Sequence, residues 1–505
     1  MTRSSLPFRH FLTVASLPVL TLAVTPLAHA DSFPTTPPPP GPAPVLSFPT
    51  PERFTLANGL EVVFARRDKL PLVTAELVIK SGSSADPEGL AGLADITAQM
   101  LTHGAGGMSA VDLVSAAEAL GSSLSTEADE DSSTISMTVL TPNLGKALDM
   151  IGRVALSPDF AGSELQRVRG EASDSVRMRL SRPGAMAAAV VGRQAFGSGS
   201  YGHPEHGTPT SLARMTVAAL KQFHDTYYRP DNAVLVLTGD ISRADAERLA
   251  SGVFGTWTRP SSVVPAVPAP VQPSALGRVV VVDQPGTGQA GVAVAHLVPR
   301  RNDAGYYGGV VANAVLGSFY SSRLNEEIRI KRGLSYGASS HFMASRDAGL
   351  LSAAIQTKNP SAAEVSSLTL GEFDGLVSRP PSENELAARK ATLVGNYGRS
   401  FETTEGLASR VAPLVLYGLD LSEITRYVPA IQAVTIGDVT AYARAHFDAR
   451  GTDLAVVGDA RQFLPALRRM HPELVVMASS DVDLDRPDLR KSPMKNPSEN
   501  PSHPK

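Results

Sequence analysis

The spacing of hydrophobic residues alternates between two periods along the chain. Leu60–Phe64, Val73–Ile79 and Thr134–Leu140 are rich in β-branched residues and partly alternate between apolar and polar positions, which predicts strands. Residues 89–102 and 110–120 instead carry apolar residues at helical spacing. Strands and helices in this order predict an α+β fold, in which a mostly antiparallel sheet is covered by helices.

Two blocks of the chain resemble each other. The segment LARMTV at 212–217 corresponds to IQAVTI at 431–436, and AVLVLTGD at 233–240 corresponds to DLAVVGD at 453–459. Both pairs align at an offset of 219 residues. One short apolar strand ending in Gly-Asp would be weak evidence, but two matches at one offset indicate a duplication. We therefore predict two homologous halves that form a clam-shell.

Proline-rich and polar stretches mark the boundaries of these halves. Residues 31–51 form a proline-rich leader that we expect to be disordered, and residues 258–275 form a proline-rich linker near the middle of the chain. Residues 479–505 become polar and dotted with proline, which predicts a disordered tail. The two halves are therefore expected at 52–257 and 276–478.

The N-terminus has the pattern of a signal peptide. Arg3 and Arg9 precede the apolar run Phe11–Ala28, and Ala28-His29-Ala30 has the small residues that signal peptidase requires. We expect residues 1–30 to be removed and the mature protein to be exported, into a bacterial periplasm. The alternative is an uncleaved membrane anchor, for which the apolar run is barely long enough.

Composition excludes several classes of function. The 505 residues carry 46 basic and 49 acidic side chains, and this balanced charge argues against a general nucleic-acid binder. The chain has no cysteine, which excludes disulfides, thiolate nucleophiles, zinc fingers and iron–sulfur clusters. No stretch after the signal peptide is long and apolar enough to span a membrane. A metal would need His, Asp or Glu as ligands.

Several motifs in order resemble a known family. The first half opens with LANGLEV at 56–62, followed by Gly82-Ser83, by Gly92-Leu93-Ala94 before a helix, and by Tyr228–Asn232 before the Gly-Asp strand. Together they resemble the pitrilysin-type, insulinase-related zinc metallopeptidases and their non-catalytic relatives. The resemblance covers residues 52–470 and includes the organisation in two halves.

The resemblance also identifies what this sequence lacks. The family binds zinc with an inverted H-x-x-E-H motif, whose two histidines lie on one face of a helix and whose glutamate is the general base, and with a glutamate from a later helix. Here Asp95, Ala98 and Gln99 stand at the motif positions, and Ser175 stands at the third-ligand position. The resemblance therefore implies a non-catalytic member that binds no zinc.

Two other motifs have a simpler explanation. In His203-Pro204-Glu205-His206 the histidines are three residues apart, and glycine and proline flank them, so a zinc-binding helix is not expected. Residues 197–202 satisfy G-x-G-x-x-G, but an alanine-rich helical run precedes them where a dinucleotide-binding motif needs a strand. We interpret this stretch as a loop. His103, near the expected end of a helix, is interpreted as a charge partner of the helix C-terminus or as a surface residue.

The second half retains a different family feature. The segment from Leu316 to Gly337 resembles the stretch that carries the family's substrate-binding Arg/Tyr pair, and Arg329 and Tyr336 have its seven-residue spacing. The resemblance implies that both side chains donate hydrogen bonds to the substrate's carbonyl beside the zinc. The alternative is a solvated helix charge and an ordinary sheet tyrosine. Of the glycine-rich loop of some relatives only Gly317 remains, which argues against that grip.

The sequence thus predicts a zinc-free subunit of a heteromeric peptidase. A partner would supply H-x-x-E-H and the zinc, whereas this chain, inactive alone, would supply Arg329 and Tyr336 for hydrolysis of peptide substrates. The main alternative is a non-catalytic peptide-binding or scaffold protein with the peptidase fold and no composite active site. A third reading, an independent zinc peptidase with a rearranged site, would require zinc bound to the isolated chain.

Overall fold

The computed structural model describes residues 48–267 and 277–491. The predicted signal peptide, most of the leader, the second part of the linker and the last residues of the tail lie outside these ranges. Within them, no helix is long and apolar enough to cross a membrane.

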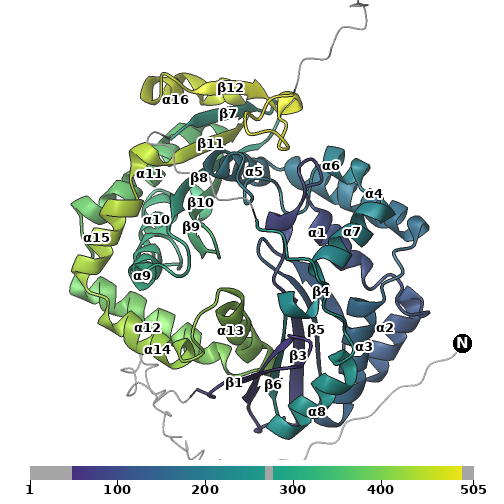
Figure 1. Ribbon diagram of the computed structural model, residues 1–505. Coiled ribbons are helices and arrows are strands. Elements are labelled where there is room, and N and C mark those ends of the chain that lie inside the picture. The colour runs from purple at the N-terminus through teal and green to yellow at the C-terminus, as the bar shows by residue number, and fades with distance from the viewer. Residues whose placement is uncertain (1–47, 268–276, 492–505) are drawn as a thin grey trace, which may run out of the picture. The chain divides into compact units, whose positions relative to one another are not determined.

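The first half contains a six-stranded sheet and eight α-helices among its described residues (Figure 1). The strands are β1 (Glu52–Thr55), β2 (Glu61–Arg66), β3 (Leu72–Ile79), β4 (Ser125–Ala128), β5 (Ser133–Leu140) and β6 (Ala233–Gly239). The helices are α1 (Leu93–Met100), α2 (Ala110–Ala119), α3 (Leu144–Leu156), α4 (Gly162–Leu180), α5 (Pro183–Phe196), α6 (Pro209–Arg214), α7 (Val217–Tyr227) and α8 (Arg243–Phe254). The strand order is β1-β2-β6-β3-β5-β4.

The second half repeats this plan. Its strands are β7 (Val279–Asp283), β8 (Gln289–Val298), β9 (Ser335–Ala344), β10 (Gly349–Lys358), β11 (Asp453–Gly458) and β12 (Val475–Ala478), in the order β12-β7-β11-β8-β10-β9. Its helices are α9 (Tyr306–Leu316), α10 (Arg323–Asn325), η4 (Glu326–Ile330), α11 (Ala362–Ser378), α12 (Glu383–Ser400), α13 (Thr404–Leu416), α14 (Glu423–Ala433), α15 (Ile436–His446) and α16 (Leu464–Met470).

The topology confirms the predicted duplication and the α+β class. β6 and β11 occupy corresponding places, each parallel to the strand on one side and antiparallel to the strand on the other. The repeated threonines also correspond, since Thr216 and Thr435 cap the N-termini of α7 and α15 with their side chains. The halves differ at one edge, because β1 is antiparallel to β2 whereas β12 is parallel to β7.

Each half covers one face of its sheet with its own helices and lends one helix to the other half. On the first sheet, Val63, Val78 and Val236 pack against Leu407 and Val411 of α13 (Figure 1). On the second sheet, the face turned toward the first half packs against α5 of that half through Met186, Ala187, Val190 and Val191. This exchange explains why every residue of β6 and β11 is buried, since both faces of each strand are covered.

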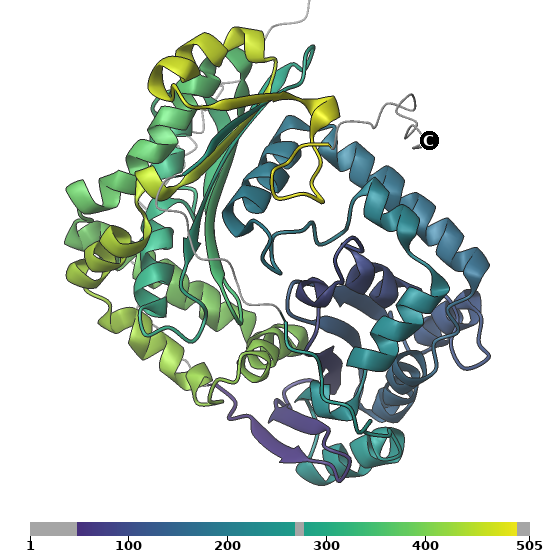
Figure 2. The same cartoon turned by 45° about the horizontal axis from the view of Figure 1, so that its top comes forward.

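Part of the tail is folded, so the prediction of disorder from residue 479 is wrong as far as Lys491. Leu484 and Leu489 are buried in the same cluster as α5. The backbone oxygen of Asp485 accepts a hydrogen bond from Arg193 at 2.8 Å, and its Oδ2 accepts one from Thr208 Oγ1 at 2.8 Å. In Figure 2 this yellow segment lies beside the blue helices of the first half. The two buried leucines and the hydrogen bonds of Asp485 together anchor this polar stretch.

The first part of the linker is anchored by a buried arginine. Arg229 is 2% exposed, and its guanidinium donates hydrogen bonds to both carboxylate oxygens of Asp231, at 2.6 and 2.9 Å. It also donates to the carbonyl of Pro260 at 3.0 Å and to Ser262 Oγ at 3.2 Å. The linker is therefore fixed to the first half where it leaves this half's sheet and helices.

Candidate functional site

Helix α1 begins at a tight contact between two glycines. Both oxygens of Asp86 accept hydrogen bonds at its first turn, from the N–H of Gly92 at 2.7 Å and of Ala94 at 2.8 Å. Gly92 has φ +88°, and a Cβ there would lie 2.7 Å from the backbone nitrogen of Gly207. Position 92 therefore requires glycine, both because of its positive φ and because a side chain would clash with Gly207. The contact places the start of α1 against the loop that carries His206.

Three of the four positions that correspond to the zinc site line one pocket. Asp95 and Gln99 lie one turn apart on α1, and Ser175 lies on α4; the pocket has a volume of about 370 Å³. The fourth position does not join them, because the Ala98 side chain is fully buried in the core of the first half. Helices α1 and α4 therefore both contribute side chains to this pocket.

The polar groups in this pocket are engaged with one another. Gln99 Nε2 donates to Asp95 Oδ1 at 3.0 Å, and Asp95 Oδ2 lies 3.0 Å from His206 Nδ1. This hydrogen bond to Asp95 raises the pKa of His206, since it favours the charged imidazolium. Asp95 is 9% exposed, and both of its carboxylate oxygens take part in these hydrogen bonds.

These donors do not fit a catalytic zinc ion. Zinc in such sites takes three strong protein ligands, and here a neutral amide and a hydroxyl stand beside one carboxylate that is already paired. No group of three or more His, Cys, Asp or Glu side chains among residues 48–267 and 277–491 could hold a metal ion. The side chain of Ala98 offers no base to a water molecule.

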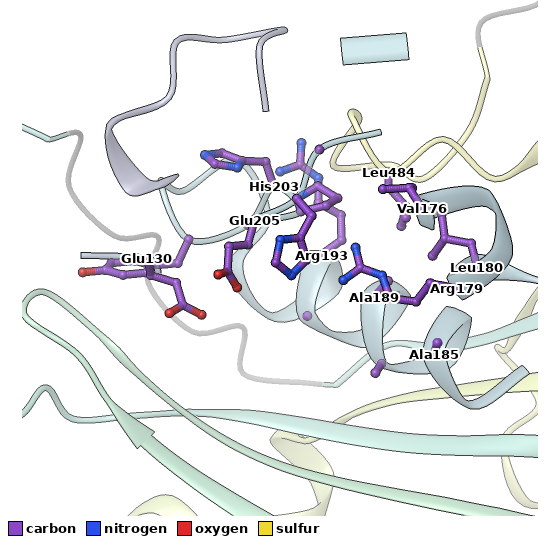
Figure 3. A pocket seen from close by; sticks show the side chains of 17 residues that line it. Glu130, Val176, Arg179, Leu180, Ala185, Ala189, Arg193, His203, Glu205 and Leu484 are labelled. Carbon is purple, nitrogen blue, oxygen red and sulfur yellow. The ribbon is translucent and has the colours of Figure 1, made fainter. Parts of the chain in front are cut away.

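A second pocket adjoins the first and shares Val176, Arg179 and His206 with it. Its volume is about 340 Å³, and Figure 3 shows Glu130 and Glu205 together at one end and Arg179 toward the other. Burial, followed by the neighbouring charge of Glu130, raises the pKa of Glu205 to about 7.

Arg329 lies in a short π-helix. The backbone hydrogen bonds of Glu326–Ile330 join residues five positions apart, a geometry frequent at functional sites. The guanidinium carbon of Arg329 lies 4.8 Å from the centre of the Tyr320 ring. Buried Asn325 ties this region to β9, accepting from the Ala338 N–H at 3.2 Å. No ion pair between Arg329 and Glu326 is present in the described part of the chain.

Tyr336 lies on β9, the edge strand of the second sheet, and its side chain is 90% exposed. It lines a third pocket of about 550 Å³ together with Arg182, Gly184 and Ala185 from the first half. Ala185 also lines the second pocket, so the three pockets follow one another along α4 and α5. An exposed phenol on an edge strand can reach a group outside its own chain.

Gly317, the remnant of the glycine-rich loop, has a structural role. Its carbonyl accepts the Ser340 N–H at 3.1 Å, and a Cβ at this position would lie 2.5 Å from that same nitrogen. The loop between α9 and α10 can therefore lie against β9 only with glycine here.

Sequence reasoning missed the residues that complete the first-half pockets. His206 was considered as a metal ligand and not as the partner of Asp95, which is 111 positions away in the chain. Glu205 was noted only as a neighbour of His203 and His206, and neither Arg179 nor Glu130 was singled out as a site residue. The spacing of charges alone could not have grouped them, because three separate segments bring them together.

The chain is similar to known proteins along most of its length. The family model described as insulinase, peptidase family M16, matches residues 61–204, and the one described as peptidase M16 inactive domain matches residues 214–393. An uncharacterized zinc protease of Mycobacterium tuberculosis is 28% identical over 413 residues, which is 81% of this chain and 93% of that protein.

Two proteins of Helicobacter pylori also match. One is described as a non-peptidase homolog, 21% identical over 79% of this chain and 92% of its own length. The other is the zinc protease PqqE, 22% identical over 78% of this chain and 90% of its own length. Among solved structures, a peptidase M16 inactive domain from Pseudomonas fluorescens has a TM-score of 0.76 and 26% identity, covering 81% of this chain and 98% of that one.

Proposed function

The chain belongs to the insulinase family, peptidase family M16, and we propose that it is the zinc-free subunit of a heteromeric, periplasmic peptidase of this family. In this assembly a second family member supplies H-x-x-E-H and its zinc ion. The chain described above supplies Arg329 and Tyr336, which bind the peptide at the partner's zinc site. By itself it does not hydrolyse peptides.

One contrast carries the proposal. The positions of the zinc site hold Asp95, Gln99 and Ser175, of which the first two are hydrogen-bonded and do not fit zinc. The second half keeps the Arg/Tyr segment, with Arg329 on a π-helix and Tyr336 exposed on an edge strand. If the protein had lost all peptidase function, the zinc-binding positions and the Arg/Tyr segment should both have been lost.

The retained pair suits the chemistry of peptide hydrolysis. A guanidinium and a phenol are both hydrogen-bond donors, and as the carbonyl carbon becomes tetrahedral its oxygen gains negative charge that such donors stabilise. The stacking of Arg329 on Tyr320 holds the guanidinium in place before substrate binds. Both groups act on the substrate and require no metal on their own chain.

The relatives supply a further argument for a pair of subunits. Helicobacter pylori has both a protein described as a non-peptidase homolog and one described as a zinc protease, and each matches this chain over more than three quarters of its length. An organism that keeps both kinds of relative is what a two-subunit peptidase predicts.

The test is kinetic and uses the purified complex of this chain with its H-x-x-E-H partner. We expect Arg329→Ala or Tyr336→Phe to lower turnover of a peptide substrate by about a hundredfold, the usual effect of removing an oxyanion donor. Lys331→Ala is the control, because Lys331 is exposed two residues away and, within residues 48–267 and 277–491, its ammonium group pairs only with Glu327. Unchanged turnover with all three variants would favour the scaffold function instead.

A further inference from the structure

The two connected pockets of the first half contain unpaired charges of both signs. Among the described residues, Glu130, Glu205 and Arg179 form no ion pair, although all three line the second pocket. Figure 3 shows the two carboxylates next to each other at one end, and Arg179 on the far side. Unpaired charge in a half-buried pocket is costly, and a ligand with complementary charges would remove this cost.

The carboxylate end is adapted to a cation. Burial raises the pKa of both glutamates; the charge of Glu130 raises that of Glu205 further, and the charge of His206 lowers both without offsetting the rise. A positive group between the two carboxylates would favour their ionised forms. The other carboxylates around the pockets are already occupied. Glu171 is bound by Arg167 at 2.9 Å, and Asp95 is bound by Gln99 and His206.

The opposite end is adapted to an anion. Arg179 lines both pockets, and its guanidinium can bind a carboxylate with two parallel hydrogen bonds. His206 uses Nδ1 for Asp95, which leaves Nε2 as a second donor; His206 is near enough to both Arg179 and Glu205 for their charges to act on it. The remaining cation of the second pocket, Arg193, is held by the carbonyl of Asp485.

Between the two ends the wall is apolar. It is formed by aliphatic side chains of α4 and α5 and by the folded tail, namely Val176, Leu180, Ala185, Ala188, Ala189 and Leu484. Beside this wall, both ring nitrogens of His203 are buried without a hydrogen-bond partner in the described chain. Volumes of about 340 and 370 Å³ suit a ligand of one or two residues.

We propose that this double pocket binds the C-terminus of peptides that end in lysine or arginine. The terminal carboxylate lies at Arg179 and His206, the aliphatic stem of the last side chain lies on the apolar wall, and its cationic group lies between Glu130 and Glu205. The site is separate from Arg329 and Tyr336 and involves no bond cleavage. It does not depend on the partner subunit.

The peptide itself provides the first test. Fluorescein-Gly-Gly-Ala-Lys is titrated with the purified mature chain, without partner, and its anisotropy is compared with that of the C-terminal amide and of the peptide ending in Gln. We expect each change to weaken binding by about tenfold or more, since each removes a charge-assisted pair. Equal binding of the three peptides, or no binding of the first at millimolar protein, would overturn the proposal.

Variants test which residues bind the carboxylate end of the peptide and which bind its cationic side chain. Arg179→Gln should abolish the preference for the free carboxylate and leave the preference for Lys over Gln. The double variant Glu130→Gln/Glu205→Gln should do the reverse. Arg177→Gln, on the same helix but outside both pockets, is the control and should retain both preferences. Thermal unfolding of each variant checks that the fold is intact, and a loss of both preferences in the control would refute the assignment.

Discussion

A buried aspartate joins the two halves, and its removal should destabilise the protein measurably. Asp131 is 1% exposed in the first half. Its Oδ1 accepts the Tyr201 hydroxyl at 2.6 Å, and its Oδ2 accepts the backbone N–H of Arg346 at 2.9 Å. Arg346 lies in the turn between β9 and β10 of the second half, and its guanidinium lies 3.4 Å from Asp131. We predict the effect of Asp131→Ala on the free energy of unfolding.

The contacts set the magnitude. Removing one partner of a buried ion pair costs about 3–5 kcal/mol, chiefly because the other charge remains buried and unpaired. Arg346 keeps part of its compensation, since it also binds Asp347 at 2.9 Å and the carbonyl of Lys80 at 3.2 Å. The Tyr201 hydroxyl and the Arg346 N–H lose their acceptor, at about 1 kcal/mol or more each. We therefore expect a loss of about 3 kcal/mol.

Urea unfolding followed by circular dichroism measures this loss. For a chain of this size, with a dependence of at least about 3 kcal/mol per molar urea, the midpoint should fall by roughly 0.5–1 M. Asp131→Asn, which keeps one acceptor, should lose less, and Glu118→Ala on the exposed face of α2 should leave the midpoint unchanged. If Asp131→Ala unfolds at the wild-type midpoint, the contact does not hold the two halves together.

Three further predictions concern the first half and the tail. Burial, with Glu127 and Asp129 nearby, raises the pKa of Glu76 to about 7. The contribution of Glu76 to the free energy of unfolding is therefore fully favourable below about pH 4.5 and is lost as the pH rises through 7. Glu76→Gln should add about 2 kcal/mol of stability at pH 8 and nothing at pH 4, measured by urea titration. Truncation after Ala478 removes two buried leucines and should cost about 3 kcal/mol, whereas truncation after Lys491 should cost nothing, by thermal unfolding. Asp95→His/Gln99→His should yield no peptidase activity against a fluorogenic peptide, since a base and a third carboxylate are still missing; cleavage by that variant would contradict the interpretation of the site.

Much of the fold could be predicted because periodicity and repetition are local signals. The duplicated Gly-Asp strands and the matched segments 212–217 and 431–436 identified the two halves, and the structure confirms the duplication in β6 and β11 and in α7 and α15. The exchange of α5 and α13 could not be predicted. An apolar helix face shows that it will be buried but does not say against which sheet.

The site divides in the same way. Asp95, Gln99 and Ser175 could be placed together because family motifs fix their helices, and the structure brings them into one pocket. The partner of Asp95 and the unpaired charges of the second pocket depend on loops that meet only in the folded chain. The folded tail was missed because its polar composition hides two well-placed leucines.

The central claim is that this chain works with a zinc-bearing relative, and co-purification tests it most directly. The tagged mature chain is isolated from a native periplasmic extract under gentle conditions, and the proteins bound to it are identified and quantified by mass spectrometry. We expect a family member with an intact H-x-x-E-H motif in near-equimolar amount. Recovery of the chain without any such relative would contradict the composite peptidase and leave Arg329 and Tyr336 without their proposed role.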